Sequence, residues 1–286
     1  MNNVITQKTN WTSVIGPRRG WFDINLKEIW QYRDLVMLFV RRDFVAKYKQ
    51  TILGPLWFIL QPLLTTLMFT IVFGRIAGIS TEGIPMILFY LSGIVAWNFF
   101  ANSLTETSGT FINNASIFGK VYFPRLVLPL SMTISGFLTF IIQFILLIGF
   151  MVYYSLNGTQ VSFTLNLVYL PLLIILLAGQ GLGFGIIISS LTIKYRDLAH
   201  LVKFGVQLWM FATPIIYPLS AIPEKYQFLV LANPVSPLIE SFRNALLGVG
   251  PVRPDLLLYS LVWTVVVFAL GIIVFNKVEK NFMDTV

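Results

Sequence analysis

The sequence contains no cysteine and only one histidine among its 286 residues. Without cysteine there is no disulfide framework, no thiolate metal site and no cysteine nucleophile, although this absence does not identify the redox compartment. Charged residues are also scarce, at 11% of the chain, whereas the surface of a soluble domain needs roughly a quarter. Apolar residues make up 56% and the mean hydropathy is +0.78. The composition therefore predicts a protein whose solvent is a lipid bilayer.

The N-terminus shows no targeting signal. The first 20 residues are polar and contain Gly16 and Pro17, so they lack the apolar core of a cleavable signal peptide. We expect no targeting peptide.

Six apolar stretches are long enough to cross the hydrocarbon core of a bilayer, which needs about 20 residues. The fifth is the weakest, because Lys203 lies near its start while Pro214 and Pro218 lie near its end. The prediction is an all-α integral membrane protein with a cytoplasmic N-terminal segment over 1–52 and a six-span domain over 53–286. The expected spans are 53–74, 84–104, 126–154, 164–193, 201–219 and 256–276.

The long connection between the fifth and sixth spans contains two short apolar pieces. The second begins at Ser236 and Pro237 and ends at Gly248, as a short helix does. The first piece, 226–232, is joined to it by the helix-breaking pair Asn233-Pro234. We expect a short re-entrant helical hairpin, whose irregular backbone must be buried in protein or face water. An amphipathic loop resting on the membrane surface is the alternative.

Lysine and arginine are distributed unevenly between alternate loops. Sixteen of the twenty lie on the side that holds both termini, and an excess of these residues marks the cytoplasmic side. The sequence therefore predicts a multi-pass membrane protein with both termini on the cytoplasmic side. This topology and attraction to anionic lipids account for the net charge of +8 without a nucleic-acid partner.

Residues 25–50 are predicted to form an interfacial helix that lies along the membrane surface. Asn25 and Glu28 resemble a capping box. An imperfect apolar stripe, interrupted by Arg33, consists of Leu26, Ile29, Trp30, Met37, Val40 and Phe44. The basic residues expected to face phosphate headgroups are Arg41, Arg42, Lys47 and Lys49. A plain membrane anchor and a partner-docking surface are both compatible with this pattern.

The pair Gly119-Lys120 invites comparison with a phosphate-binding loop. Such a loop needs a glycine five residues before this pair and a serine or threonine directly after it. Here those positions hold Asn114 and Val121, so we expect no nucleotide site on this chain.

The same stretch has the signals of a short helix on the cytoplasmic face. Asn113 or Asn114 can cap its start, Gly119 can end it, and Pro124 prevents fusion with the next span. We expect this helix over about 113–119, with a positively charged connector as the plainer interpretation.

Features that would indicate an enzyme or a proton-coupled transporter are missing from the sequence. The glycine-rich stretch 179–185 lies inside a predicted span, where such spacing favours close helix packing over dinucleotide binding. Acidic residues lie outside the spans or at their ends, as Glu106 does, although proton relays need them at membrane depth. We therefore expect no catalytic group, metal site or cofactor on this chain, and energy from another source.

Four segments resemble, in order, the transmembrane subunit of bacterial ABC exporters for polysaccharides and polyol phosphates such as O-antigen, capsule and teichoic acid. They are YKQTILGPLWFILQPLL (48–64), VYFPRLVLPL (121–130), IKYRDLAHLV (193–202) and Asn233-Pro234. The resemblance covers nearly the whole chain. It implies a homodimer that forms the pore, two separate ATPase subunits that carry ATP and magnesium, and a lipid-linked glycan as the substrate.

The resemblance also implies roles for two cytoplasmic helices. The short helix between spans two and three would couple the ATPase to transport, through Asn113, Asn114, Ser116, Ile117, Phe118, Lys120 and Arg125. The interfacial helix would help to seat the ATPase, and its candidate residues are Trp30, Arg33, Arg41 and Arg42.

A channel lined by aromatic side chains is the third implication of the resemblance. Candidate residues are Trp57, Phe58, Tyr90, Trp97, Phe99, Phe100 and Trp209, whose flat apolar faces suit the C–H surfaces of sugars. Interface anchoring or plain lipid contact would explain the same residues. Two alternative functions share the hydrophobicity: a related ABC exporter of drugs or small lipids, and a membrane-embedded glycan-modifying transferase. The transferase needs acidic groups or histidines that converge at the membrane face, and the sequence shows none.

Overall fold

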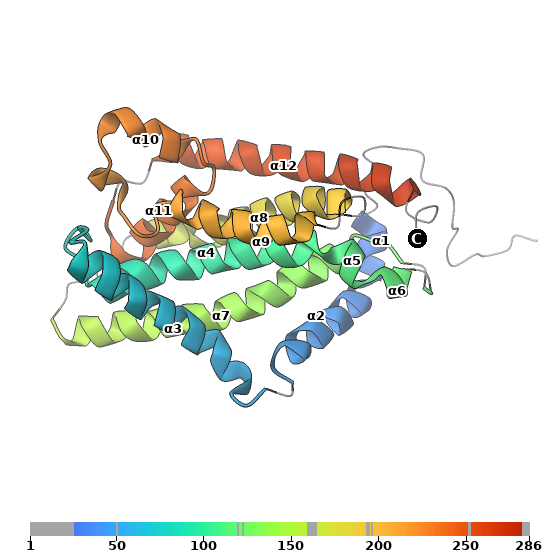
Figure 1. Cartoon of the computed structure of the whole chain (residues 1–286), viewed down its shortest axis with the longest axis horizontal. Coiled ribbons are helices and arrows are strands. Elements are labelled where there is room, and N and C mark those ends of the chain that lie inside the picture. The colour runs from blue at the N-terminus through green and yellow to red at the C-terminus, as the bar shows by residue number, and fades with distance from the viewer. Residues whose placement is uncertain are drawn as a thin grey trace, which may run out of the picture.

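Long helices run side by side along the length of the molecule (Figure 1). The computed structural model describes residues 26–49, 51–118, 120, 121, 123–158, 165–192, 195, 197–250 and 253–281, and this part of the chain contains no strand. The helices are α1 (Leu26–Gln31), α2 (Arg33–Tyr48), α3 (Trp57–Phe69), α4 (Met86–Ser108), α5 (Thr110–Asn113), α6 (Ala115–Phe118), α7 (Val127–Leu156), α8 (Leu170–Thr192), α9 (Leu198–Phe211), α10 (Glu224–Leu231), α11 (Ser236–Leu247) and α12 (Pro254–Asn281).

Five of the six predicted spans are confirmed as helices long and apolar enough to cross a membrane. They are Gly54–Ile76, Met86–Ser108, Val127–Leu156, Asn166–Thr192 and Pro254–Lys277. The first consists of α3 with a π-helical turn, Thr70–Ile76, at its end.

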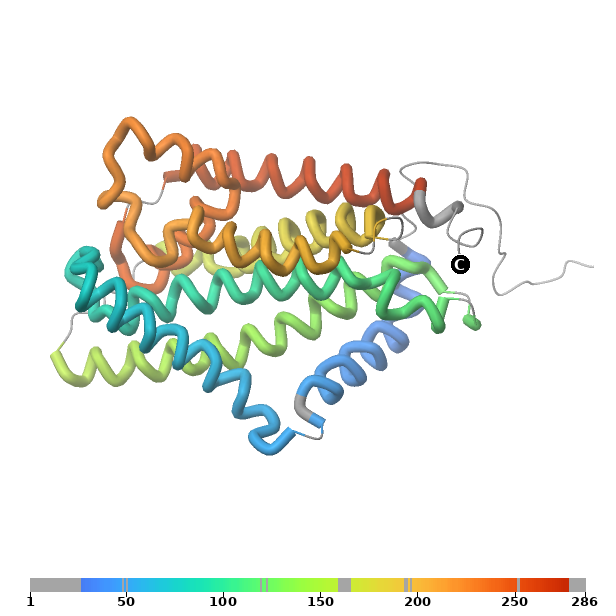
Figure 2. The backbone as a smooth tube through the Cα atoms, viewed as in Figure 1, coloured from blue at the N-terminus to red at the C-terminus, as the bar shows by residue number. Residues whose placement is uncertain are grey.

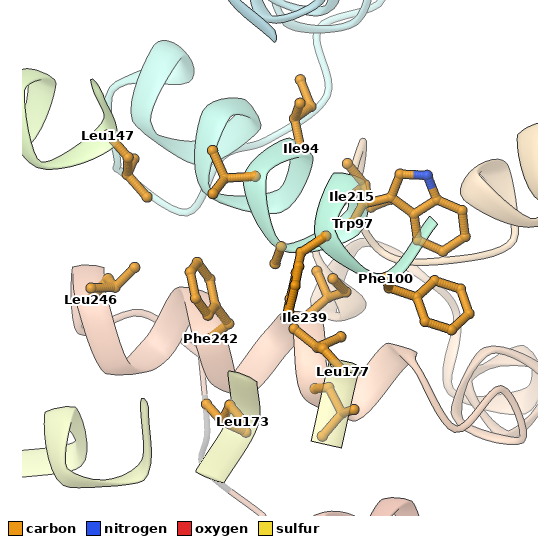
Figure 3. Close-up of a cluster of buried hydrophobic side chains, with 14 of the residues drawn as sticks. Ile94, Trp97, Phe100, Leu147, Leu173, Leu177, Ile215, Ile239, Phe242 and Leu246 are labelled. Atoms are coloured by element: carbon orange, nitrogen blue, oxygen red, sulfur yellow. The ribbon is translucent and has the colours of Figure 1, made fainter. Parts of the chain in front are cut away.

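Helix α4 lies at the centre of the bundle and contacts α3, α7, α8, α9 and α11. Its apolar residues occur on all sides, so it is buried rather than amphipathic. Figure 3 shows part of the core that results, a single buried cluster that contains Ile94 and Phe100 of α4, Leu177 of α8 and Phe242 of α11. The core therefore joins the spans α4, α7, α8 and α12 to helix α11.

The glycines of α8 bring three helix backbones into contact, as the packing interpretation predicts. A Cβ on Gly181 would lie 2.8 Å from the carbonyl oxygen of Phe100 on α4. On the other face of α8, a Cβ on Gly183 would lie 3.1 Å from the backbone nitrogen of Phe268 on α12. Two pairs of glycines spaced i and i+4, Gly181 with Gly185 and Gly179 with Gly183, thus allow α8 to fit between α4 and α12.

We expect Gly185→Ala to destabilise the protein by about 1–3 kcal/mol, because the added methyl group overpacks a contact between backbones. Its Cβ would meet Thr107 Cβ at 2.5 Å and the Leu104 carbonyl oxygen at 2.9 Å. Gly149→Ala on α7 is the matched control, since nothing lies within 4 Å of that Cβ position. Gel filtration after heating in detergent measures the folded fraction. Equal midpoints for both variants would contradict the packing role.

The fifth predicted span differs from the structure. The stretch 201–219 was expected to be one helix, but α9 ends at Phe211 and the next seven residues form irregular turns. Its 14 residues span about 21 Å, less than the hydrocarbon core of about 30 Å. Pro214 has no N–H to continue the helix. Thr213 and Ile215 are buried, which irregular backbone inside a membrane protein requires.

The predicted hairpin between the fifth and sixth spans is confirmed as two helices, α10 and α11. The Asn233 carboxamide oxygen accepts a hydrogen bond from the backbone nitrogen of Val235 at 3.1 Å, and Gly248 ends α11 with a φ of 71°. Nearly all of α11 is buried against α4, α8 and α12, whereas α10 has no buried residue. The alternative, an amphipathic loop resting on the surface, is therefore wrong for α11. Helix α10 lies at the surface of the molecule, but it is a helix rather than a loop.

The N-terminal helix differs from its expected form in two ways. A break at Tyr32 divides it into α1 and α2, and its buried face is Val36, Phe39 and Val40, which packs toward α7. Trp30 and Met37 of the predicted stripe are 70% and 65% exposed. The proposed capping residue Asn25 lies outside the described residues. Figure 2 shows α2 at the same end of the bundle as α5, α6 and the end of α12.

Candidate coupling surface and aromatic cluster

Two one-turn helices, α5 and α6, connect α4 to α7. The predicted short helix at 113–119 is confirmed over Ala115–Phe118, while Gly119 lies outside the described part of the chain. The carboxamide of Asn114, between the two turns, donates to the Thr110 carbonyl at 3.1 Å and accepts from the Arg42 guanidinium at 3.2 Å. Asn114 therefore joins the connecting segment to α2.

Phe118 anchors α6 to the bundle. Its side chain is 7% exposed and its ring stacks on Phe123, with ring centroids 5.7 Å apart. Phe111, which lies 5.5 Å from Phe118, contacts Phe275 of α12 at 5.1 Å. The Arg125 guanidinium lies 5.7 Å from the centroid of the Phe118 ring. A force on α6 would thus reach α7 and α12 through packed rings.

The other residues chosen for this segment lie at its surface. Asn113, Ser116 and Lys120 are exposed, and Ile117 is half-buried. The segment therefore combines an anchored ring with exposed polar groups that a partner can reach.

A pocket of about 430 Å³ lies between α2, the end of α4, the connecting segment and α7. Two ion pairs stand at its wall: Lys47 with Glu106 at 3.1 Å, and Arg42 with Asp43 at 2.7 Å. Arg42 and Lys47 were expected to face lipid headgroups, and for both that expectation is wrong. They turn toward the protein because acidic and amide groups there satisfy their charge.

The remaining candidates on the interfacial helix point outward. Trp30, Arg33 and Arg41 are exposed, and the Arg33 guanidinium lies 5.9 Å from the Trp30 ring centroid. They lie within reach of lipid or of a partner.

Three of the seven aromatic candidates form one cluster between α4 and α9. Phe100 lies 5.2 Å from both Trp97 and Trp209, measured between ring centroids. Phe184 of α8 completes the cluster at 5.3 Å from Trp209. Trp97 and Phe100 are almost fully buried, whereas Trp209 is half-buried. Within one chain, Trp209 and Phe184 are the half-buried members of the cluster.

The other four candidates lie elsewhere. Phe99 packs against Phe140 of α7 at 4.9 Å, and Tyr90 packs against Phe69 of α3 at 6.1 Å. Trp57 is 46% exposed at the start of α3, next to Phe58. The seven rings do not share one surface within a single chain, so a common channel stays a prediction.

Sequence reasoning missed two exposed rings on α9. Phe204 and Phe211 are 61% and 48% exposed, and they lie on one face with Leu208. Their spacing of seven residues, two turns of helix, was the signal that could have identified them.

Arg243 was also missed, because it was counted with the cations of an outer loop. It is 1% exposed and pairs with Glu240, its partner three residues earlier, at 3.2 Å. Two opposite charges three residues apart in an otherwise uncharged helix were the signal that could have identified Arg243.

Comparison with known proteins gives concordant results. The family model described as ABC-2 type transporter matches residues 34–247. The chain is 29% identical over 254 residues to the O-antigen export system permease protein RfbA of Klebsiella pneumoniae, which covers 88% of this chain and 94% of that protein. It is 29% identical to the protein of the same name from Myxococcus xanthus, over 76% and 82% of the two chains. The polysialic acid transport protein KpsM of Escherichia coli is 25% identical, over 85% and 93%.

Proposed function

Because the chain belongs to the ABC-2 type transporter family, we propose that it is the permease subunit of an exporter that moves a lipid-linked polysaccharide across the bacterial cytoplasmic membrane. The observation that carries this proposal is the match to polysaccharide export permeases over most of both chains. The five long apolar helices suit a multi-pass protein of the inner membrane.

A separate ATPase subunit supplies the energy in this proposal. ATP and magnesium bind to that subunit, and the surface that receives it is α6 together with the outer face of α2. Exposed Ser116 and Lys120 offer polar contacts there. Phe118 transmits the movement to Phe123, which precedes α7, and through Phe111 to Phe275 of α12. The location of α2, α5 and α6 at one end of the bundle (Figure 2) supports a shared cytoplasmic end, the side on which the distribution of lysine and arginine also predicts both termini.

Two copies of the chain form the passage. Helix α9 has no buried residue within one chain, and α3 is covered only slightly by its neighbours. Gln61 on α3 and Gln207 on α9 are exposed, and an amide that faces lipid without a hydrogen-bond partner is costly. These faces therefore suit a second copy or a hydrated passage better than lipid. Trp57 and Trp209 belong to the same two helices, which supports a role for their rings beside the proposed passage.

The test is to reconstitute the chain in vesicles with and without its ATPase subunit. We expect no ATP hydrolysis by the chain alone, and ATP-dependent movement of a lipid-linked glycan by the complex. Steady ATP turnover without the partner would refute the division of labour. Transport of hydrophobic dyes but not of glycan by the complex would replace the proposal with a drug or small-lipid exporter.

A further inference from the structure

Arg243 of α11 is the largest fully buried side chain described in the molecule, and it is charged. Its guanidinium contacts the Glu240 carboxylate at 3.2 Å and lies 3.8 Å from the centroid of the Phe89 ring. Its Nη2 donates to the carbonyl oxygens of Pro214 and Ile215 at 3.1 and 3.3 Å. A buried charge is costly unless it is paired and hydrogen-bonded, so these contacts determine whether α11 can occupy the bundle.

The two carbonyls belong to the irregular segment after α9. Buried carbonyl oxygens outside a regular helix need hydrogen-bond donors from elsewhere in the protein, and Pro214 supplies no N–H of its own. Arg243 provides the missing donors from another helix. Asn233, before α11, adds a second connection by donating to the Thr213 hydroxyl at 2.9 Å. Residues 213–215 are therefore bonded to the α10–α11 hairpin at two points.

Helix α4 is shaped to admit this arrangement. A Cβ on Gly93 would lie 3.0 Å from Arg243 Nη2 and 3.1 Å from the Ile215 side chain, so a larger residue would displace both. Trp97 follows one turn later on α4. Figure 3 shows Ile215, Trp97 and Phe100 in the same buried cluster. The Arg243 contacts therefore adjoin the aromatic cluster.

We propose that Arg243 is a positioning residue that joins residues 213–215 and α11 into one unit at the outer end of the passage. Opening this end moves the unit as a whole. Separation of residues 213–215 from α11 would leave the carbonyl oxygens of Pro214 and Ile215 and the Nη2 group of Arg243 without these hydrogen bonds in apolar surroundings, which costs more than shifting the unit on its apolar contacts. The role in passage rests on the proposed function, whereas the unit rests on the contacts alone.

A single cysteine can report on the unit, because the chain has none of its own. We place it at Thr213, which is buried, and measure its rate of labelling by an impermeant maleimide in membranes. Arg243→Met is expected to raise this rate by at least about tenfold, as local opening does, and Arg243→Lys less, because the charge is kept. Arg253→Met is the matched control, since that arginine is half-exposed at the same end. A cysteine at Ser103, buried in α4, should stay protected in all variants.

Unchanged labelling at 213 in Arg243→Met would overturn the proposal. So would equal increases at 213 and 103, because they indicate general loosening. If Arg243→Met does not insert into the membrane, the labelling rates at 213 and 103 are compared in Arg243→Lys instead. Export per folded protein should fall in the Arg243 variants and not in Arg253→Met. Increased labelling at 213 together with native export in the Arg243 variants would overturn the role in passage. Failure of the complex with the native chain to export glycan would refute the proposed function, but it would leave the labelling result intact.

Discussion

Replacement of Ala115–Phe118 by a flexible Gly–Ser linker of equal length is expected to abolish glycan export while ATP hydrolysis by the assembled complex continues. The outer face of α2 still seats the ATPase subunit, but no rigid element then connects that subunit to the spans. Phe118 is the residue that makes the connection, since its ring is packed between Phe111 and Phe123. Surface glycan and ATP turnover are each measured per assembled complex. We expect the amount of glycan exported per ATP hydrolysed to fall to near zero.

Single substitutions refine this expectation. Phe118→Ala removes a buried ring, a change that costs about 3–5 kcal/mol, and should reproduce most of the linker's effect on export. Val121→Ala changes an exposed residue three positions beyond Phe118 and is the matched control. Normal export with the linker in place would refute the coupling role of α6. Loss of ATPase binding with the linker would assign α6 to assembly instead.

Trp57→Leu is expected to lower export several-fold without lowering stability. Its ring is 46% exposed on α3, so truncation removes little buried area, while a flat face for sugar stacking is lost. Phe100→Leu is the buried comparison: Phe100 is fully buried and presents no ring face to sugar within one chain, so we expect export per folded protein close to native. Phe100→Ala therefore carries a folding cost of about 3–5 kcal/mol that must be separated from transport. Measuring surface glycan per unit of folded, inserted protein separates the loss of folding from the loss of transport.

Trp263→Leu on α12 provides the matched control, since this ring is also on a span and 39% exposed. We expect native export from it, because loss of a lipid-facing ring leaves the passage unchanged. Native export by Trp57→Leu would show that this ring is structural. A deficit in Trp263→Leu as large as that in Trp57→Leu would show that any tryptophan at the membrane matters equally.

Most of the fold could be predicted, because crossing a membrane requires long apolar helices that the sequence shows directly. The glycines of 179–185 were predictive as well, since small residues at i and i+4 have one common use in lipid. The fifth span was wrong in its second half. Pro214 and Pro218 indicated a kink, but the choice between a kink and a complete stop depends on whether a distant group can satisfy the free carbonyls. Arg243 is that group, 28 residues from Ile215.

The candidate coupling surface was predictable in position but not in its connections. The turn at Ala115–Phe118 followed from local capping signals. The bond between Asn114 and Arg42 joins residues 72 positions apart, and no local pattern indicates it. The buried face of α2 was missed for a related reason. Several of its faces carry apolar residues, and only the position of α7 decides that Phe39 is covered and Met37 is not.

The close contacts on both faces of α8 hold α4, α8 and α12 together as a fixed frame. The other parts of the subunit are freer to move. Gly183 lies against α12, where its carbonyl oxygen lies 3.0 Å from the position of a Cβ on Gly271, and Gly185 lies against α4. Because the glycines leave no side chain of α8 at these contacts, the helices lie too close for one to slide without losing contact with the others. We therefore expect movement in the helices with little cover, α3 and α9, and in the unit formed by residues 213–215 and α11. Adaptation to a different cargo can then proceed by changes in those two helices, while α4, α8 and α12 keep the frame on which any such change is built.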